Sequence, residues 1–251
     1  MDNSLTGKIA VISGSDSGIG AQIARELSHV GATVIINYPY SDPSLVSRAN
    51  AVLTSLKTPG LAIEADLSTA TGPRKLIDAV AEIYGKIDIL INNAGIAINL
   101  PFEEQTLEHW DQIVNLNGRG TFLLTQAALP HLAKKDSRIV NICSISARDG
   151  PQMQTIYAGS KGMVDSFTRV WAKELPPKYG CTVNSVSPGP TRTEGFEAAG
   201  EDFMKLMGPV IEKTPVGARF AEKEEIAYAV MMLCLPRASV REHRAVENFL
   251  F

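Results

Sequence analysis

The sequence predicts a single doubly wound α/β domain, in which a mainly parallel sheet carries helices on both faces. Short apolar runs rich in β-branched residues, typical of buried parallel strands, alternate with segments of helical periodicity. The first run leads directly into a glycine-rich turn that opens a helix. Although 251 residues allow one α/β domain or two small ones, this regular alternation favours one.

Each expected element follows from such a local pattern. Expected strands lie at residues 8–13, 32–37, 61–65, 89–91, 138–143 and 182–187. Expected helices lie at 21–29, 44–57, 107–117, 121–133, 156–175 and 221–235, and a further helix ends at residue 84. Proline and glycine mark several ends, since Pro59 and Gly60 follow one helix, residues 118–120 separate the two long helices, and Pro176 follows another.

Composition and charge argue against several classes of function. The content of 45% hydrophobic and 20% charged residues is ordinary for a soluble globular protein. The net charge of −3 gives no electrostatic reason to expect nucleic acid or an anionic membrane surface as a partner. No apolar run approaches the ~20 residues that span a bilayer, and we expect no signal peptide. Cys143, Cys181 and Cys234 lack metal-ligand spacing, so we expect no metal, buried thiols and a cytoplasmic protein.

The turn after the first expected strand has the features of a dinucleotide-binding loop. Gly14 permits a tight turn, Gly18 lets the backbone approach a pyrophosphate, and Gly20 allows the helix to pack closely on the strand. Phosphates then meet the exposed amides of the helix N-terminus. A glycine-rich turn that binds nothing is the alternative, and the strand–turn–helix context favours binding. The expected cofactor contacts in this turn are Ser13, Gly14, Ser15, Ser17, Gly18, Ile19 and Gly20.

This spacing, Gly-x-x-x-Gly-x-Gly after a serine, resembles the short-chain dehydrogenase/reductase family, which has a Rossmann-type fold. The run Asn-Asn-Ala-Gly at residues 92–95 is a second signature of that family. Small residues at the end of a strand let a flat ligand lie against the backbone, and asparagine amides tie adjacent strands together. The resemblance assigns cofactor contacts to Asn93, Ala94 and Gly95.

The end of the second expected strand bears on which nicotinamide cofactor binds. An acidic residue there would bind the ribose hydroxyls of NAD and repel a 2′-phosphate. Asn37 and Tyr38 are uncharged, and Asp42 is the first carboxylate after them. Residues 15–17 of the glycine turn provide no cation, although many NADP enzymes have one there. We expect NADP(H) rather than NAD(H), with Asn37, Tyr38 and Ser41 among its contacts.

Asp66 follows the third expected strand at its carboxyl end, where open α/β sheets bind ligands. The resemblance implies that Asp66, with Leu67 beside it, contacts the adenine. The alternative is an N-cap for a helix that begins near Ser68, and both roles can hold. The segment 188–193 resembles a family segment that contacts the nicotinamide carboxamide and the phosphates. It supplies Pro188, Gly189, Thr191 and Thr193.

Tyr157 and Lys161 lie four residues apart on one expected helix, so their side chains share a face. An ammonium beside a phenol favours the phenolate, which suits tyrosine to proton transfer near neutral pH. Alone, this spacing is more often a half-buried aromatic and a solvated lysine. In the family the pair is catalytic and a serine precedes the tyrosine at a fixed distance. Ser144 matches that distance, and Ser146 is its neighbour.

Asn117 resembles the catalytic asparagine of the family. Asparagine within a helix is mildly unfavourable, and a local cap or kink beside two glycines is the alternative. Residues 194–217 would cover the substrate. We expect the apolar side chains of this region to form a lid, with an apolar core as the alternative. They are Phe196, Phe203, Met204 and Met207.

The resemblance ends near residue 235, so we assign 1–235 to the dinucleotide-binding and catalytic domain and 236–251 to an atypical tail. The family adds a seventh strand here, whereas this tail has no glycine and no clear strand pattern. Either residues 246–251 replace that strand or the edge of the sheet is covered differently.

The resemblance implies a reductase or dehydrogenase that acts on a small-molecule ketone or alcohol and is assembled as a homodimer or homotetramer. A hydrophobic or aromatic ketone is the favoured substrate. Tyr157 would supply the proton, Ser144 would orient the carbonyl oxygen, Lys161 would also hold ribose hydroxyls, and Asn117 would position a water. Asn37, Tyr38 and residues 117–120 are most similar to fungal polyhydroxynaphthalene reductases, and 3-oxoacyl-carrier-protein reductases are the other close relatives. A non-catalytic nucleotide-binding protein, and a lyase, epimerase or cyclase of the same fold, are the alternatives.

Overall fold

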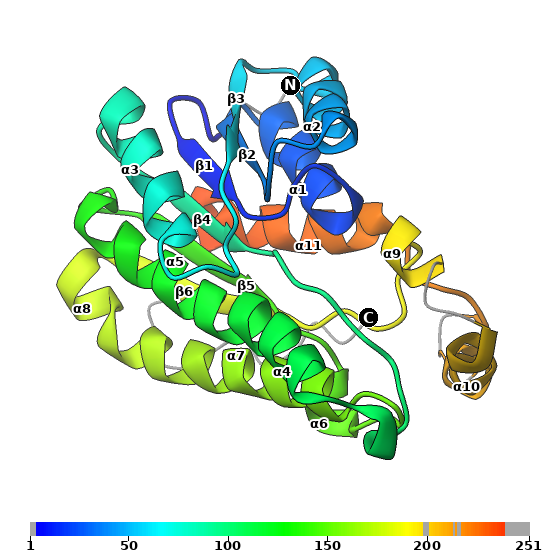
Figure 1. The fold of residues 1–251 in the computed structure, drawn as a ribbon. Helices are drawn as coiled ribbons and strands as arrows, with labels where there is room; N and C mark the ends of the chain where they lie inside the picture. Colours follow the sequence, from blue (N-terminus) through cyan, green and yellow to red (C-terminus); the bar gives the residue numbers. More distant parts are fainter. Residues whose placement is uncertain (1–3, 198–200, 213, 215–216, 239–251) are drawn as a thin grey trace.

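Six parallel strands run side by side through the molecule in the order β3-β2-β1-β4-β5-β6 (Figure 1). The computed structural model describes residues 4–197, 201–212, 214 and 217–238. The strands are β1 (Ile9–Ile12), β2 (Thr33–Tyr38), β3 (Gly60–Glu64), β4 (Ile89–Asn92), β5 (Ser137–Ile142) and β6 (Cys181–Val186). Every expected strand is present, and the predicted parallel, doubly wound architecture is confirmed. The strand order reverses between β1 and β4, where open α/β sheets bind their ligands.

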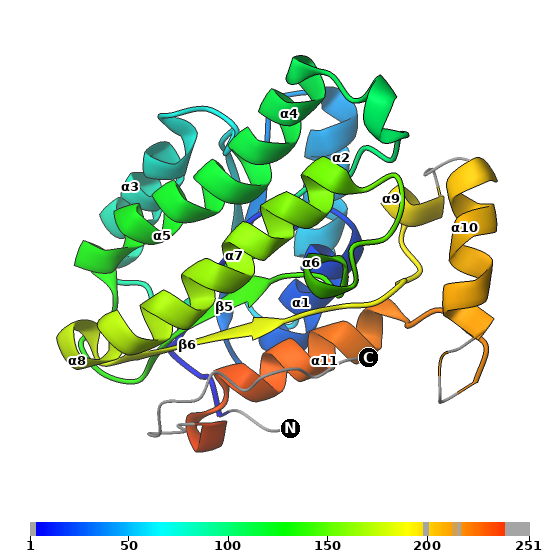
Figure 2. The same cartoon turned by 90° about the horizontal axis from the view of Figure 1, so that it is seen from below.

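Helices cover both faces of the sheet (Figure 2). Three helices, α1 (Gly18–His29), α2 (Pro43–Ser55) and α11 (Lys223–Cys234), contribute to the apolar core on one face. The core on the other face includes residues of α3 (Gly72–Tyr84) and α5 (Thr121–Ala128) and borders α7 (Thr155–Glu174). Side chains of a strand alternate between faces, so Ala10 and Ile12 join the first core and Val11 joins the second.

The predicted break between two long helices at residues 118–120 is wrong. Instead α4 (Leu107–Val114) continues through a π-helical turn, Asn115–Gly120, into α5. Gly118 has a packing role, because a Cβ atom there would lie 2.6 Å from the sulfur of Met163 on α7. The helix expected to reach residue 133 ends at Ala128, and a 3₁₀ turn over Leu129–His131 contains Pro130, which lacks an N–H for a helical hydrogen bond.

Short helices occupy several of the connections. They are α6 (Ser146–Asp149), α8 (Pro176–Tyr179), α9 (Glu194–Glu197) and α10 (Glu201–Glu212). Pro176 and Pro177 follow α7 as predicted, but they open a further helical turn. Residues 246–251, one of the two alternatives for covering the edge at a seventh strand, lie outside the described residues. In the part described, β6 is one edge strand of the sheet and β3 is the other. None of the helices in the described ranges is long and apolar enough to cross a membrane.

A chain of buried hydrogen bonds joins β4 and β5 to the helices above them. The Nδ2 atom of Asn92 donates to Oγ1 of Thr125 at 2.9 Å and to Oδ1 of Asn141 at 2.7 Å. The Nδ2 atom of Asn141 in turn donates to Oγ1 of Thr168 at 2.7 Å. These side chains are at most 3% exposed, so each lost partner leaves a polar group without compensation from water.

We expect Asn141→Ala to lower the free energy of unfolding by about 2–3 kcal/mol, because it leaves the amide of Asn92 and the hydroxyl of Thr168 short of a partner. Urea unfolding followed by circular dichroism measures this change. Asn50→Ala on the exposed side of α2 is the control, with an expected change within about 0.5 kcal/mol. Equal stability of the two variants would contradict the structural role of the Asn92–Asn141 bond.

Candidate active site

The glycine turn between β1 and α1 leaves an open place beside the helix N-terminus. Gly14 and Gly18 both have a φ of +57°, a region that disfavours side chains. A Cβ atom on Gly18 would meet a single described neighbour within 4 Å, the methyl group of Thr193 at 4.0 Å. Ser17, the N-cap residue of α1, makes no side-chain capping bond. The amides at the start of α1 can therefore bind phosphate oxygens, and this cradle fits the pyrophosphate of a dinucleotide.

Ser13 and Asn93 clamp the glycine turn to the end of β4. The Oγ atom of Ser13 accepts hydrogen bonds from the backbone N–H groups of Asn93 at 2.9 Å and Ala94 at 3.0 Å. The Nδ2 atom of Asn93 donates to the carbonyl oxygens of Ser13 at 2.9 Å and Gly14 at 2.8 Å. Gly20 completes the clamp, since a Cβ atom there would lie 2.5 Å from the Asn93 amide.

Asn37 joins the ends of three strands. Its Oδ1 atom accepts from the backbone N–H of Gly14 at 3.1 Å, and its Nδ2 atom donates to the carbonyl oxygens of Ala65 at 3.0 Å and Ile63 at 3.3 Å. Ser15 has a similar role, because its buried hydroxyl donates to the carbonyl oxygen of Ile12 at 2.7 Å and accepts from the Asn37 N–H. These two predicted contact residues shape the cofactor site through bonds within the protein.

The remaining polar residues at this end of the sheet are more exposed. Tyr38 is half-buried at the end of β2. Ser41 is exposed, and its hydroxyl donates to Glu64 at 3.3 Å. Asp66 accepts from the backbone N–H of Ser68 at 2.9 Å and from its hydroxyl at 2.7 Å. The predicted helix start near Ser68 is wrong, because Asp66 caps a local turn and α3 begins at Gly72.

Tyr157 and Lys161 lie on the first turns of α7, as the spacing predicts. The Lys161 ammonium is 5.9 Å from the centroid of the Tyr157 ring. It donates to the carbonyl oxygen of Ile142, the last residue of β5, at 2.8 Å, and Lys161 is only 5% exposed. Ser144 follows two residues after that carbonyl, and its Oγ atom accepts from the backbone N–H of Ser146 at 3.1 Å.

Asn117 lies in the π-helical turn and bridges two segments. Its Oδ1 atom accepts from the Ile96 N–H at 2.9 Å. Its Nδ2 atom donates to the Ile96 carbonyl oxygen at 2.9 Å and to the hydroxyl of Ser160 at 3.0 Å. A Cβ atom on Gly95 would lie 3.2 Å from Oδ1 of Asn117 and 3.3 Å from the Lys161 ammonium. The structure therefore brings Asn117 and Lys161 to the same small residue after β4.

The segment 188–193 crosses back toward the glycine turn. Pro188 accepts from the Ile145 N–H at 3.1 Å, which ties it beside Ser144. The hydroxyl of Thr191 donates to the carbonyl oxygen of Gly189 at 3.0 Å. Thr193 approaches Gly18 through its methyl group, and its hydroxyl accepts from the Phe196 N–H at 3.1 Å. The predicted cofactor contacts of this segment thus lie between the pyrophosphate cradle and Ser144.

Two aromatic side chains of the predicted lid, Phe196 and Phe203, contact each other. Phe203 and Met207 on α10 are buried. The ring centroid of Phe196 is 5.8 Å from that of Phe203 and 5.3 Å from that of Phe220. Figure 1 shows α9 and α10 at the side of the molecule, away from the sheet. These residues form a separate small cluster, and their role as a substrate cover stays a prediction.

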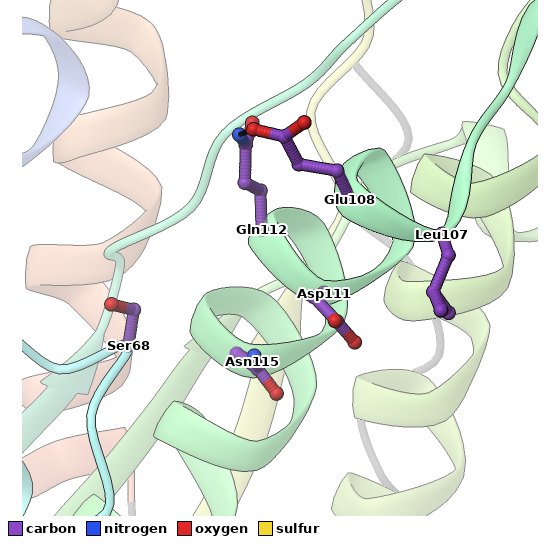
Figure 3. Close-up of a pocket in the computed structure, with 6 residues that line it drawn as sticks. All are labelled: Ser68, Leu107, Glu108, Asp111, Gln112 and Asn115. Carbon is purple, nitrogen blue, oxygen red and sulfur yellow. Dashed lines mark hydrogen bonds between the residues drawn. The ribbon is translucent and has the colours of Figure 1, made fainter.

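A surface pocket of about 500 Å³ lies elsewhere, between the β3–α3 connection and the outer side of α4 (Figure 3). Its lining residues are Ser68, Leu107, Glu108, Asp111, Gln112 and Asn115. None of the predicted catalytic side chains lines it. We place the candidate active site at the carboxyl ends of β1, β4 and β5, because that is where the predicted residues converge.

Analysis of the sequence missed one ionic contact at the glycine turn. Asp16 is only 6% exposed, and its Oδ2 atom accepts from Nε of Arg48 at 3.0 Å and from Nη2 at 2.5 Å. Arg48 lies on α2, which starts after the end of β2. A carboxylate within a phosphate-binding turn was the available signal, because a buried carboxylate requires a cation.

The predicted thiol environment is confirmed. Cys143, Cys181 and Cys234 are buried free cysteines. Burial raises the pKa of Cys143 and of Cys181 to about 11, and that of Cys234 to about 12. All three therefore remain protonated thiols near neutral pH and are poor nucleophiles.

Known proteins resemble the chain over most of its length. A family model described as enoyl-(acyl carrier protein) reductase matches residues 14–241. A hydroxynaphthalene reductase from Aspergillus fumigatus is 36% identical over 190 residues, which cover 76% of this chain and 68% of that protein. A 3-oxoacyl-[acyl-carrier-protein] reductase from Synechocystis is 32% identical over 239 residues, which cover 94% of this chain and 92% of that protein. The crystal structure of a short chain dehydrogenase from Burkholderia cenocepacia in complex with NADP is 33% identical, with a TM-score of 0.85, and the match covers 95% of each chain.

We expect Gly18→Val to weaken binding of a nicotinamide dinucleotide by more than about 100-fold, because the side chain fills the place of the pyrophosphate and blocks its backbone contacts. Titration of the purified protein with NADPH, followed by nicotinamide fluorescence, measures the dissociation constant. Gly85→Val is the matched control, since Gly85 also has a positive φ, of 71°, and no neighbour within 4 Å of its Cβ position. An unchanged dissociation constant for Gly18→Val would place the cofactor elsewhere.

Proposed function

From the premise that this chain belongs to the short-chain dehydrogenase/reductase family of oxidoreductases, we propose that it reduces a hydrophobic or aromatic ketone with NADPH. The match to the family model and the similarity to these relatives confirm the family that the sequence motifs suggested. The observation that carries the proposal is the convergence of Tyr157, Lys161, Ser144 and Asn117 at the carboxyl ends of β4 and β5.

Four side chains divide the chemistry among them. A bound NADPH supplies the hydride that reduces the carbonyl carbon. The phenol of Tyr157 donates the proton that the carbonyl oxygen needs, as a general acid. The hydroxyl of Ser144 donates a hydrogen bond to that oxygen and stabilises the charge that develops on it. Lys161 keeps a fixed positive charge beside the phenol, and Asn117 supports the water that restores the proton.

The position of Lys161 is well defined because a backbone carbonyl holds its ammonium. The bond to the Ile142 carbonyl oxygen uses one of three N–H donors of the ammonium. The other two can face ribose hydroxyls and a water molecule. Since Lys161 is nearly inaccessible to solvent, its charge acts on Tyr157 with less screening than at the surface.

NADP(H) is the proposed cofactor because the last two residues of β2 are uncharged. Asn37 and Tyr38 occupy the positions where a carboxylate would select the unphosphorylated ribose. A short chain dehydrogenase of 33% identity was crystallised with NADP, which supports the same choice. The proposed substrate class rests on the similarity to a hydroxynaphthalene reductase and on the aromatic cluster around Phe196.

We also propose a homodimer or homotetramer, in which α5 and α7 contact a second copy. Phe122 and Val170 are 39% and 47% exposed. The ring of Phe122 also begins an aromatic row: its centroid is 6.0 Å from that of Phe167, which is 5.2 Å from that of Trp171. Apolar surface of this kind favours burial against another protein surface.

We expect Tyr157→Phe to lower ketone reduction by about 100- to 10,000-fold, because the phenol supplies the proton, and to leave the NADPH dissociation constant close to wild type. Loss of NADPH absorbance with a panel of hydrophobic and aromatic ketones measures turnover. Tyr228→Phe on the exposed side of α11 is the control and retains full activity. Turnover that survives in Tyr157→Phe would remove the phenol from this role.

Ser144→Ala tests the stabilisation of the carbonyl oxygen. We expect turnover to fall by about 100- to 1,000-fold, the usual effect of losing one such donor. Ser146→Ala is the comparison, because Ser146 lies two residues away and its backbone N–H, which bonds Ser144, is kept. A larger loss in Ser146→Ala than in Ser144→Ala would exchange the two roles.

Product formed without net oxidation of NADPH would instead favour a lyase, epimerase or cyclase.

A further inference from the structure

The charge at the glycine turn is unusual for a phosphate site. Asp16 places a carboxylate between Gly14 and Gly18, in the turn whose amides face phosphates. A negative charge there opposes anion binding unless a cation compensates it. Arg48 supplies that cation, through two hydrogen bonds from Nε and Nη2 to the same carboxylate oxygen.

The guanidinium of Arg48 lies beside the glycine turn and is partly exposed. Arg48 is on the fifth position after Pro43, in the second turn of α2, and its side chain is 51% exposed. The pKa of Asp42 is lowered mainly by hydrogen bonds from Ser44 and, to a smaller degree, by the charge of Arg48. The pKa of Glu194 is lowered mainly by a backbone hydrogen bond and by Lys223, with a small effect of Arg48. Besides its direct bonds to Asp16 in the glycine turn, the charge of Arg48 thus reaches the start of α2 and the start of α9.

This place adjoins the expected position of the adenosine ribose. In doubly wound folds the ribose hydroxyls lie near the end of the second strand, and an arginine nearby accommodates a 2′-phosphate. Here the glycine turn is bonded directly to the end of β2, since the N–H of Gly14 donates to the Asn37 side chain and the N–H of Ser15 to the Asn37 carbonyl oxygen. Asp16 follows Ser15 directly and accepts the two hydrogen bonds from Arg48, so Arg48 is tied close to the end of β2.

The remaining donors of Arg48 suit a phosphate. Among the described residues, Arg48 donates hydrogen bonds through Nε and Nη2, and both go to Asp16. The Nη1 group is left to bind a ligand. A guanidinium presents its N–H groups in a planar fork that matches phosphate oxygens. With one edge fixed on Asp16, the other edge can turn to a ligand with little further loss of side-chain freedom.

We propose that Arg48 binds the 2′-phosphate of NADP(H) and so determines the preference for the phosphorylated cofactor. This assignment rests on the proposed function and deepens it, because it names the residue that distinguishes NADPH from NADH. It also accounts for the absence of a cation at residues 15–17: the positive charge comes from α2.

The test compares NADPH and NADH, which differ only in the 2′-phosphate, by fluorescence titration of the wild type and of Arg48→Gln. The dissociation constant for NADPH is expected to rise by about 10- to 100-fold, as for a lost charge-assisted contact. The constant for NADH is expected to rise by a smaller factor, because the pyrophosphate of either cofactor then meets an Asp16 carboxylate without its cation. Arg48→Lys keeps the positive charge but loses the planar fork of N–H groups, so its dissociation constant for NADPH is expected to lie between those of the wild type and Arg48→Gln. Arg25→Gln is the matched control, because Arg25 is a neighbouring arginine on α1 whose Nε donates to Ser55 in an exposed contact.

The outcomes separate this assignment from the proposed function. Equal weakening of NADPH and NADH in Arg48→Gln would mean contact with the pyrophosphate and would overturn the assignment. So would unchanged constants for both cofactors. In either case, tight NADPH binding and ketone reduction by the wild type would leave the proposed function intact. A wild type that binds NADPH no more tightly than NADH would overturn both the assignment and the cofactor preference.

Discussion

Hydrogen bonds from asparagine side chains join the carboxyl ends of the parallel strands, and the geometry of the candidate active site depends on them. Where strands end, the sheet no longer pairs the backbone groups, and these groups need other partners. Asn37 supplies them between β1, β2 and β3. Asn93 does so between β4 and the glycine turn, and Asn117 between the segment after β4 and α7. An amide suits all three places because it both donates and accepts.

The same bonds explain why small residues cluster at this edge. With Asn93 drawn against the turn, Gly20 has no room for a side chain. With Asn117 and Lys161 both close to Gly95, that position also excludes larger residues. The space left over lies beside Gly18, where the helix amides remain uncapped. Among the described residues, packing thus leaves the turn open beside Gly18, where a dinucleotide phosphate can meet the helix amides.

The sequence was sufficient where the signal is local. A β-branched run predicts a buried strand, and glycine spacing between a strand and a helix predicts the turn, so both agree with the structure. The sequence was insufficient where contacts between distant segments decide the local structure. Residues 118–120 suggested a break, yet the chain stays helical through a π-helical turn, and Gly118 gives Met163 of α7 the room to pack against it. Likewise, Asp16 and Arg48 are 32 positions apart, and only the fold brings them together.

The region after β6 that is predicted to cover the substrate is organised differently from the rest of the site. Phe196 and Phe203 of this region pack with Phe220, which follows it, and the three rings belong to neither main core. Ion pairs join this region to the start of α11, between Glu194 and Lys223 at 3.1 Å and between Arg192 and Glu222 at 3.4 Å. Exposed pairs of this kind contribute little to stability. Substitutions in the cluster can therefore change this region while α7, which carries Tyr157 and Lys161, keeps its position.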